Sequence, residues 1–94
     1  MEDVYEKLYK RNTKRRFSFL YTELITEMLL EKYYGIFEKE TKESILNEVV
    51  GLRYFTKKEI DNIFNNAIKL LEIKYNLQVI DLNPIKFEKL KDEK

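Results

Sequence analysis

The chain has 94 residues, of which 44% are hydrophobic and 37% charged, and its formal net charge at pH 7 is +1. This length suits a single domain with its own packed core. No apolar run approaches the roughly 20 residues of a membrane helix, the first residues are too charged for a signal peptide, and the lack of cysteine excludes disulfides and thiolate metal sites. We therefore expect a cytoplasmic protein with no cofactor, no metal and no membrane partner.

The charge is distributed unevenly along the chain. Residues 1–16 carry six basic and three acidic side chains, residues 17–50 carry three and seven, and residues 51–94 carry nine and seven. We interpret residues 1–16 as a basic N-terminal arm or short helix that loosens at Asn12 and Thr13. Such a charge run is usually a solvated arm. It also offers phosphate contacts, through Lys10, Arg11, Lys14, Arg15 and Arg16.

Apolar residues recur at helical spacing after the arm and predict a helix over residues 17–34. The apolar stripe consists of Leu20, Tyr21, Leu24, Ile25, Met28, Leu29 and Tyr33. Lying off this stripe are Thr22, Glu23, Thr26, Glu27 and Glu31. Gly35 follows, and a glycine in the left-handed region can close the last turn of a helix.

A second, shorter helix is predicted in "ESILNEVV", residues 43–50. Thr41 is its expected N-cap, because a threonine hydroxyl can accept a hydrogen bond from an unpaired amide of the first turn. Gly51 is expected to end this helix. The side facing the core is expected to carry Ile45, Leu46, Val49 and Val50.

The third helix begins with a strong local signal. Thr56 and Glu59 have the spacing of a capping box, and Phe55 and Ile60 have that of a hydrophobic staple. Apolar residues continue at helical spacing to Tyr75, and Asn76 is placed to end the helix because Asn tolerates the left-handed conformation.

The hydrophobic period changes after Asn76. The segments "LQVIDL" and "IKFEKL" flank Asn83 and Pro84, a turn-forming pair, and Ile85 and Phe87 alternate with charged residues. We favour a β-hairpin here over a terminal helix capped by Asn83. Residues 91–94 are expected to be a frayed tail.

The predicted order is thus a basic arm, a long helix, a short helix, a second long helix and a hairpin, with residues 17–90 forming one helical domain. This order resembles the winged helix-turn-helix superfamily of DNA-binding domains. The segment "TKESILNEVVGL" corresponds to the second helix, "TKKEIDNIFNNAIKLLEIKY" to the recognition helix and "LQVIDLNPIKFEKL" to the wing. The resemblance implies a mainly α fold, with a three-helix core and a C-terminal β-hairpin wing.

The resemblance also implies a small DNA-binding protein, a transcriptional regulator or an architectural factor. In a major groove, Asn62, Asn65 and Asn66 have the paired donor and acceptor that read adenine. Phosphate or guanine contacts would come from Lys57, Lys58 and Lys69, with Lys86 adding a backbone contact from the wing. The competing interpretation is that these side chains are an ordinary solvated face. A homodimer built on the first helix would suit a DNA-binding protein, since two half-sites need two copies.

Enzyme activity is not expected. The chain has no His or Cys, Ser18 and Ser44 stand in no nucleophile motif, and there is no Gly-rich phosphate loop. The alternative function is that of a helical protein adaptor, accessory subunit or inhibitor that does not bind nucleic acid. Its partner would bind an aromatic surface, formed by Tyr33, Tyr34, Phe37 and Tyr54.

Overall fold

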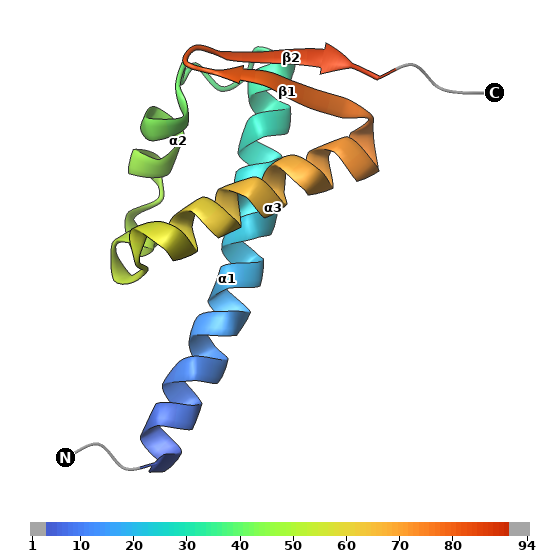
Figure 1. Ribbon diagram of the computed structural model, residues 1–94. Coiled ribbons are helices and arrows are strands. Elements are labelled where there is room, and N and C mark those ends of the chain that lie inside the picture. The colour runs from blue at the N-terminus through green and yellow to red at the C-terminus, as the bar shows by residue number, and fades with distance from the viewer. Residues whose placement is uncertain (1–3, 91–94) are drawn as a thin grey trace.

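The computed structural model describes the backbone of residues 4–90 and the side chains of residues 16–90. The elements are α1 (Val4–Tyr33), α2 (Lys42–Glu48), the 3-10 helix η1 (Val50–Tyr54), α3 (Lys57–Tyr75), β1 (Leu77–Leu82) and β2 (Ile85–Lys89) (Figure 1). The chain is therefore mainly helical, with a small antiparallel sheet after the helices, as predicted. In this described part of the chain, no helix has the length and apolar character needed to cross a bilayer.

The first helix is one continuous element of 30 residues, about 45 Å long at a rise of about 1.5 Å per residue. The break expected at Asn12 and Thr13 does not occur, since the backbone is helical from residue 4 to residue 33. Both residues are only weakly unfavourable in a helix, and the Lys and Arg residues around them are good helix formers. The side chains of Lys10, Arg11, Lys14 and Arg15 lie outside the described residues.

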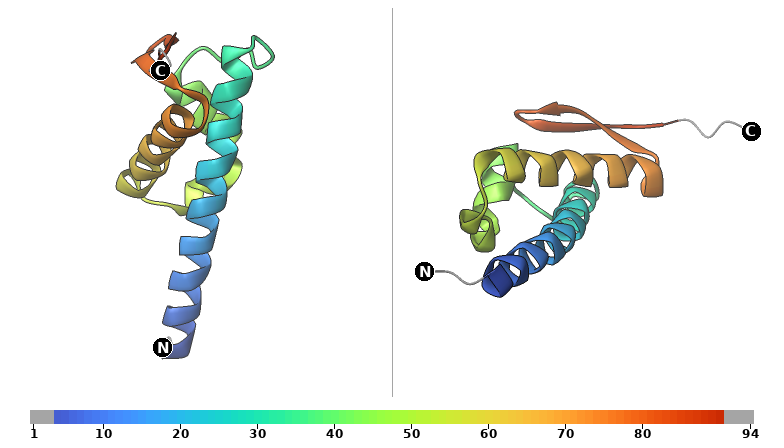
Figure 2. Two further views of the ribbon diagram at one scale, coloured as in Figure 1. Left: turned by 90° about the vertical axis from the view of Figure 1, so that its right-hand side faces the viewer. Right: turned by 60° about the horizontal axis from the view of Figure 1, so that its bottom comes forward.

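α1 and α3 cross, and the core is centred on this crossing. α3 passes across the middle of α1, and the N-terminal half of α1 extends away from every other element (Figure 1). Figure 2 shows that α3 and the hairpin lie on the same side of α1. The side chains packed between these elements with almost no exposure are Ile25, Leu29, Ile45, Ile63, Phe64, Leu71 and Leu77.

The buried side of α1 is rotated relative to the apolar stripe predicted from the sequence. Thr22 and Thr26, which lie off that stripe, are only 6% and 5% exposed, while Leu20 and Leu24 are exposed. Each threonine hydroxyl donates to the carbonyl four residues earlier, at 2.8 and 2.7 Å. The hydroxyls are thus satisfied within the helix, which lets α3 pack closely on this side.

The second helix begins as predicted but ends early. Thr41 is the N-cap, and it forms a capping box in which its hydroxyl accepts from the Ser44 amide at 3.1 Å. The helix ends at Glu48, so Val50, which was expected to face the core, lies in η1 and is 65% exposed. Gly51 also lies inside η1 and does not end α2. Its lack of a side chain makes room for Tyr21 of α1, whose hydroxyl a Cβ at Gly51 would overlap.

Both ends of α3 match the prediction. The Thr56 hydroxyl accepts from the Glu59 amide at 3.2 Å, and the Glu59 carboxylate accepts from the Thr56 amide at 2.9 Å. Asn76 closes the helix in the left-handed conformation, with φ 54°. Phe55 and Ile60, the predicted staple pair, are both half-buried against the core.

The hairpin is also confirmed. β1 and β2 pair in antiparallel register, with Leu82 opposite Ile85 and a cis peptide bond between Asn83 and Pro84 in the loop. A bulge between Val79 and Asp81 shifts the alternation by one residue. The shift places Leu82 on the core side, where Leu77, Val79, Ile85 and Phe87 also pack.

Candidate nucleic-acid interface

The outer face of α3 carries a polar stripe. Lys58, Asn62, Asn65 and Lys69 follow one another at intervals of four, three and four residues, which places them on one side of a helix. All four side chains are exposed, because the opposite side of α3 carries the core residues. No hydrogen bond or ion pair between described residues uses these four side chains, so we define them as the outer stripe of α3.

The acidic residues at the start of α3 are engaged within the protein. Glu59 belongs to the capping box. An Asp61 carboxylate oxygen lies 3.2 Å from Nζ of Lys42, which also sits 5.0 Å from the centre of the Phe64 ring. These contacts satisfy two of the negative charges of α3, so they interfere less with an anion bound at the outer stripe.

The other residues predicted for nucleic-acid binding are not on the outer stripe. Asn66 is exposed but lies at the flank of α3, where it lines a hollow together with Ser18 and Phe19 of α1. Lys57 is exposed at the first turn, and its spacing from Lys58 places it about 100° around the helix. Lys86 is exposed on β2, opposite Asp81 on β1.

The basic N-terminal segment is an extension of α1. Arg16 is exposed, and it is the only residue among the predicted basic contacts of this segment whose side chain is described. In a continuous helix, the positions of Lys7, Arg11 and Lys14 share one side with Ser18 and Thr22, at intervals of three and four. Thr22 is on the side of α1 that α3 covers.

The aromatic residues proposed for protein binding do not form one surface. Tyr33 stacks edge-on against Tyr34 and Phe87, with ring centres 5.2 and 5.7 Å apart, and Phe37 packs against the core. Tyr54 lies in η1, near the start of α3, whereas Tyr33 lies at the far end of α1 (Figure 1). The Arg53 guanidinium lies 4.9 Å from the centre of the Tyr54 ring and donates to the Tyr54 hydroxyl at 2.9 Å.

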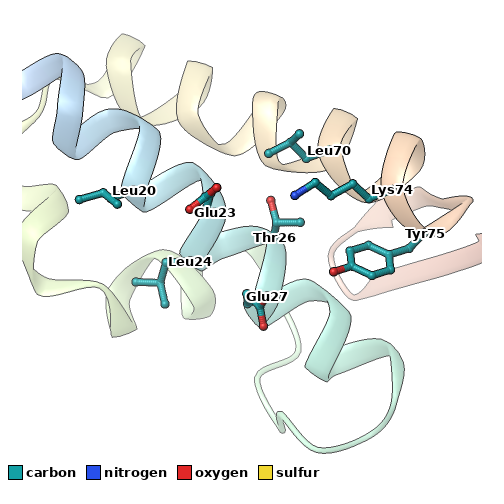
Figure 3. A pocket seen from close by; sticks show the side chains of 8 residues that line it. All are labelled: Leu20, Glu23, Leu24, Thr26, Glu27, Leu70, Lys74 and Tyr75. Atoms are coloured by element: carbon teal, nitrogen blue, oxygen red, sulfur yellow. The ribbon is translucent and has the colours of Figure 1, made fainter.

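A different apolar surface, which the sequence analysis did not identify, follows the crossing of α1 and α3. It consists of two adjoining hollows of about 340 and 400 Å³ that share Leu70, and Figure 3 shows the first of them. We call it the α1–α3 groove. The apolar residues that line it are Phe19, Leu20 and Leu24 of α1 and Leu70, Ile73 and Tyr75 of α3.

The rotation of α1 explains why the sequence did not reveal this groove. Leu20 and Leu24 fit a helical apolar stripe, which favoured placing them in the core. The burial of Thr22 and Thr26 turns the two leucines outward, and Ile73 on α3, which lines the adjoining hollow, is 77% exposed. The one available signal was that Phe17, Phe19 and Leu20 lie on different sides of the helix, which exceeds what one neighbouring helix can cover.

The described residues contain no group of three or more acidic side chains arranged to hold a metal ion. The exposed Lys and Asn side chains of the outer stripe suit recognition of phosphates and base edges. No protein-family model matches the chain, and comparisons with curated proteins and with solved structures give no match.

Proposed function

We propose that this protein binds double-stranded DNA through the outer stripe of α3, in the manner of a winged helix-turn-helix domain whose wing is the β1–β2 hairpin. The stripe would enter the major groove. There Asn62 and Asn65 would read base edges, since an Asn side chain can pair with both N6 and N7 of adenine. Lys58 and Lys69, at the two ends of the stripe, would contact phosphates or guanine edges.

The observation that carries this proposal is that the outer stripe is polar, exposed and unpaired on a helix whose ends are fixed. The capping box at Thr56 and the Asn76 cap define where α3 begins and ends. Four buried residues, Ile63, Phe64, Ala67 and Leu71, fix which side faces out. A helix held in this way presents its outer side chains in one orientation, which base reading requires.

The N-terminal half of α1 supports the same proposal. α3 passes in front of α1 in Figure 1, and below this crossing the side of α1 that α3 covers is open. The positions of Lys7, Arg11 and Lys14 belong to this side. Basic residues there would contact the DNA backbone beside the groove occupied by α3, which adds affinity without sequence preference.

A fluorescence anisotropy titration with a labelled duplex of random sequence tests this proposal. If the basic segment and the outer stripe neutralise about six phosphates, the logarithm of the association constant should fall with the logarithm of salt concentration with a slope near −5. The double variant Lys58→Ala/Lys69→Ala should reduce the magnitude of that slope by about 2. The Asn62→Ala/Asn65→Ala variant should mainly reduce the difference in affinity between duplexes of different sequence, with a smaller effect on the affinity for a random duplex.

Lys39→Ala is the matched control. Lys39 lies on the connector after α1, and its Nζ already forms an ion pair with Oε1 of Glu48 in α2, at 2.9 Å. This variant should leave the salt slope nearly unchanged. Absence of binding at low salt, or an equal effect of the control and the Lys58→Ala/Lys69→Ala variant, would contradict the proposal. Circular dichroism of each variant shows that the fold is retained.

A further inference from the structure

The α1–α3 groove exposes several large apolar side chains to water. In one of its two hollows Phe19 is 62% exposed and Ile73 is 77% exposed, and in the other Leu20, Leu24 and Tyr75 are exposed. Contiguous apolar patches of this kind on soluble proteins mark binding surfaces more often than isolated exposed residues do. We therefore treat the groove as a binding surface.

The charges along α1 indicate what binds in the groove. Residues 17–31 of α1 carry three acidic side chains and no basic one, whereas residues 4–16 carry six basic side chains and one acidic one. Glu23 and Glu27 line the groove from α1 (Figure 3), and Lys69 and Lys74 line it from α3. A helix packed along α1, beside Glu23 and Glu27, should be basic as well as apolar, and the N-terminal half of α1 in a second copy of this chain has that character.

The length of α1 agrees with this assignment. Its N-terminal half extends beyond the other elements (Figure 1), and a helical segment of this length is marginally stable in water without tertiary packing. In one copy, the basic half lacks a neighbour and the acidic half has an open apolar groove. In two antiparallel copies, each basic half would lie on the acidic half of the other.

We propose that the protein forms a homodimer through antiparallel packing of two α1 helices in the α1–α3 grooves, with the two-fold axis near Leu20. Arg16 then lies beside Glu23 and Glu27 of the partner subunit, and Leu20 and Leu24 lie in the seam. A parallel pair would instead align like charges along the whole helix. The outer stripe of α3 does not line the groove apart from Lys69 at its edge, so it stays accessible in the dimer, whereas the N-terminal half of α1 takes part in both proposals.

Charge exchange between two chains tests both the dimer and its antiparallel orientation. Arg16→Glu alone places like charges together in the dimer, and so does Glu23→Lys/Glu27→Lys alone. We expect each variant to raise the dimer dissociation constant at least about tenfold in sedimentation equilibrium, which corresponds to about 1.4 kcal/mol. When the two variants are mixed, each new charge faces an opposite one, and a heterodimer should form with near-wild-type affinity.

Two further variants complete the experiment. Leu20→Glu should also prevent dimerisation, while Ile80→Glu, at an exposed apolar position on the hairpin, should not. A wild-type chain that sediments as a monomer at millimolar concentration would overturn the proposal. Failure of the two charge variants to associate when mixed would overturn the antiparallel arrangement. DNA binding by a monomeric Leu20→Glu variant would separate this result from the proposed function.

Discussion

Replacing Gly51 by Ala tests how closely η1 packs against α1. A Cβ at this position would overlap the Tyr21 hydroxyl and would lie 2.7 Å from Cζ of the ring. The backbone of Gly51 needs no left-handed conformation, so alanine itself is compatible with η1 and would stabilise the fold by about 0.4–1 kcal/mol if no atom were in the way. The effect of the substitution therefore depends on the displacement of Tyr21.

Displacing the Tyr21 ring has an estimable cost. Overpacking typically costs about 1–3 kcal/mol. The ring also packs edge-on against Phe55, at 5.7 Å between centres, and such a pair contributes about 0.5–1.5 kcal/mol. We expect Gly51→Ala to lower the free energy of unfolding by about 1–3 kcal/mol overall. For a domain of this size, each kcal/mol corresponds to about 4–8 °C in Tm.

A double-mutant cycle in urea isolates this contact. In a Tyr21→Ala background the obstructing ring is gone, and Gly51→Ala should become neutral or stabilising, giving a coupling energy of about 1–3 kcal/mol. Gly35→Ala is the matched control. It should destabilise by about 1–2 kcal/mol in both backgrounds, because Gly35 has φ +76° and no neighbouring atom within 4 Å of an added Cβ. An equal effect of Gly51→Ala with and without Tyr21 would refute the packing described here.

Two other substitutions have clear expected outcomes. Phe64→Ala removes a fully buried ring at the crossing of α1 and α3 and should cost about 3–5 kcal/mol, whereas Val50→Ala, on the exposed side of η1, should change stability by less than about 0.5 kcal/mol; equal losses in urea denaturation would show that the core is misplaced. Thr56→Ala removes the N-cap of α3 and should cost about 1 kcal/mol, while Thr56→Ser should cost only a few tenths because serine keeps the capping hydroxyl. Similar losses for the two Thr56 variants would mean that the capping hydrogen bond does not stabilise α3.

The features that sequence reasoning predicted correctly are those fixed by neighbouring residues. The capping box of Thr56 and Glu59, the Asn76 cap and the hairpin loop each depend on a few consecutive residues, and all are present. Features that depend on distant contacts were missed. They include the early end of α2 and the close packing of Gly51 against Tyr21 of α1, which no local pattern contains.

The candidate site shows the same division between local and distant effects. Lys58, Asn62, Asn65, Asn66 and Lys69 were predicted to lie on the polar side of this helix; all five are exposed, but Asn66 lies at the flank, in the hollow beside α1. The α1–α3 groove was not predicted, because threonines replace leucines on the buried side of α1. Which side of α1 is buried depends on how closely α3 approaches α1. The two helices are close at this point, since the Thr26 hydroxyl lies 3.4 Å from the Ala67 carbonyl.

Mapping the DNA contact by NMR tests the central claim most directly. Amide chemical shifts of the ¹⁵N-labelled protein would be followed while an unlabelled duplex is added at low salt. The account predicts that the largest shifts occur at and next to Lys58, Asn62, Asn65 and Lys69 and in residues 4–16. Shifts confined to the α1–α3 groove, or no shifts at a duplex concentration of about 1 mM, would contradict it.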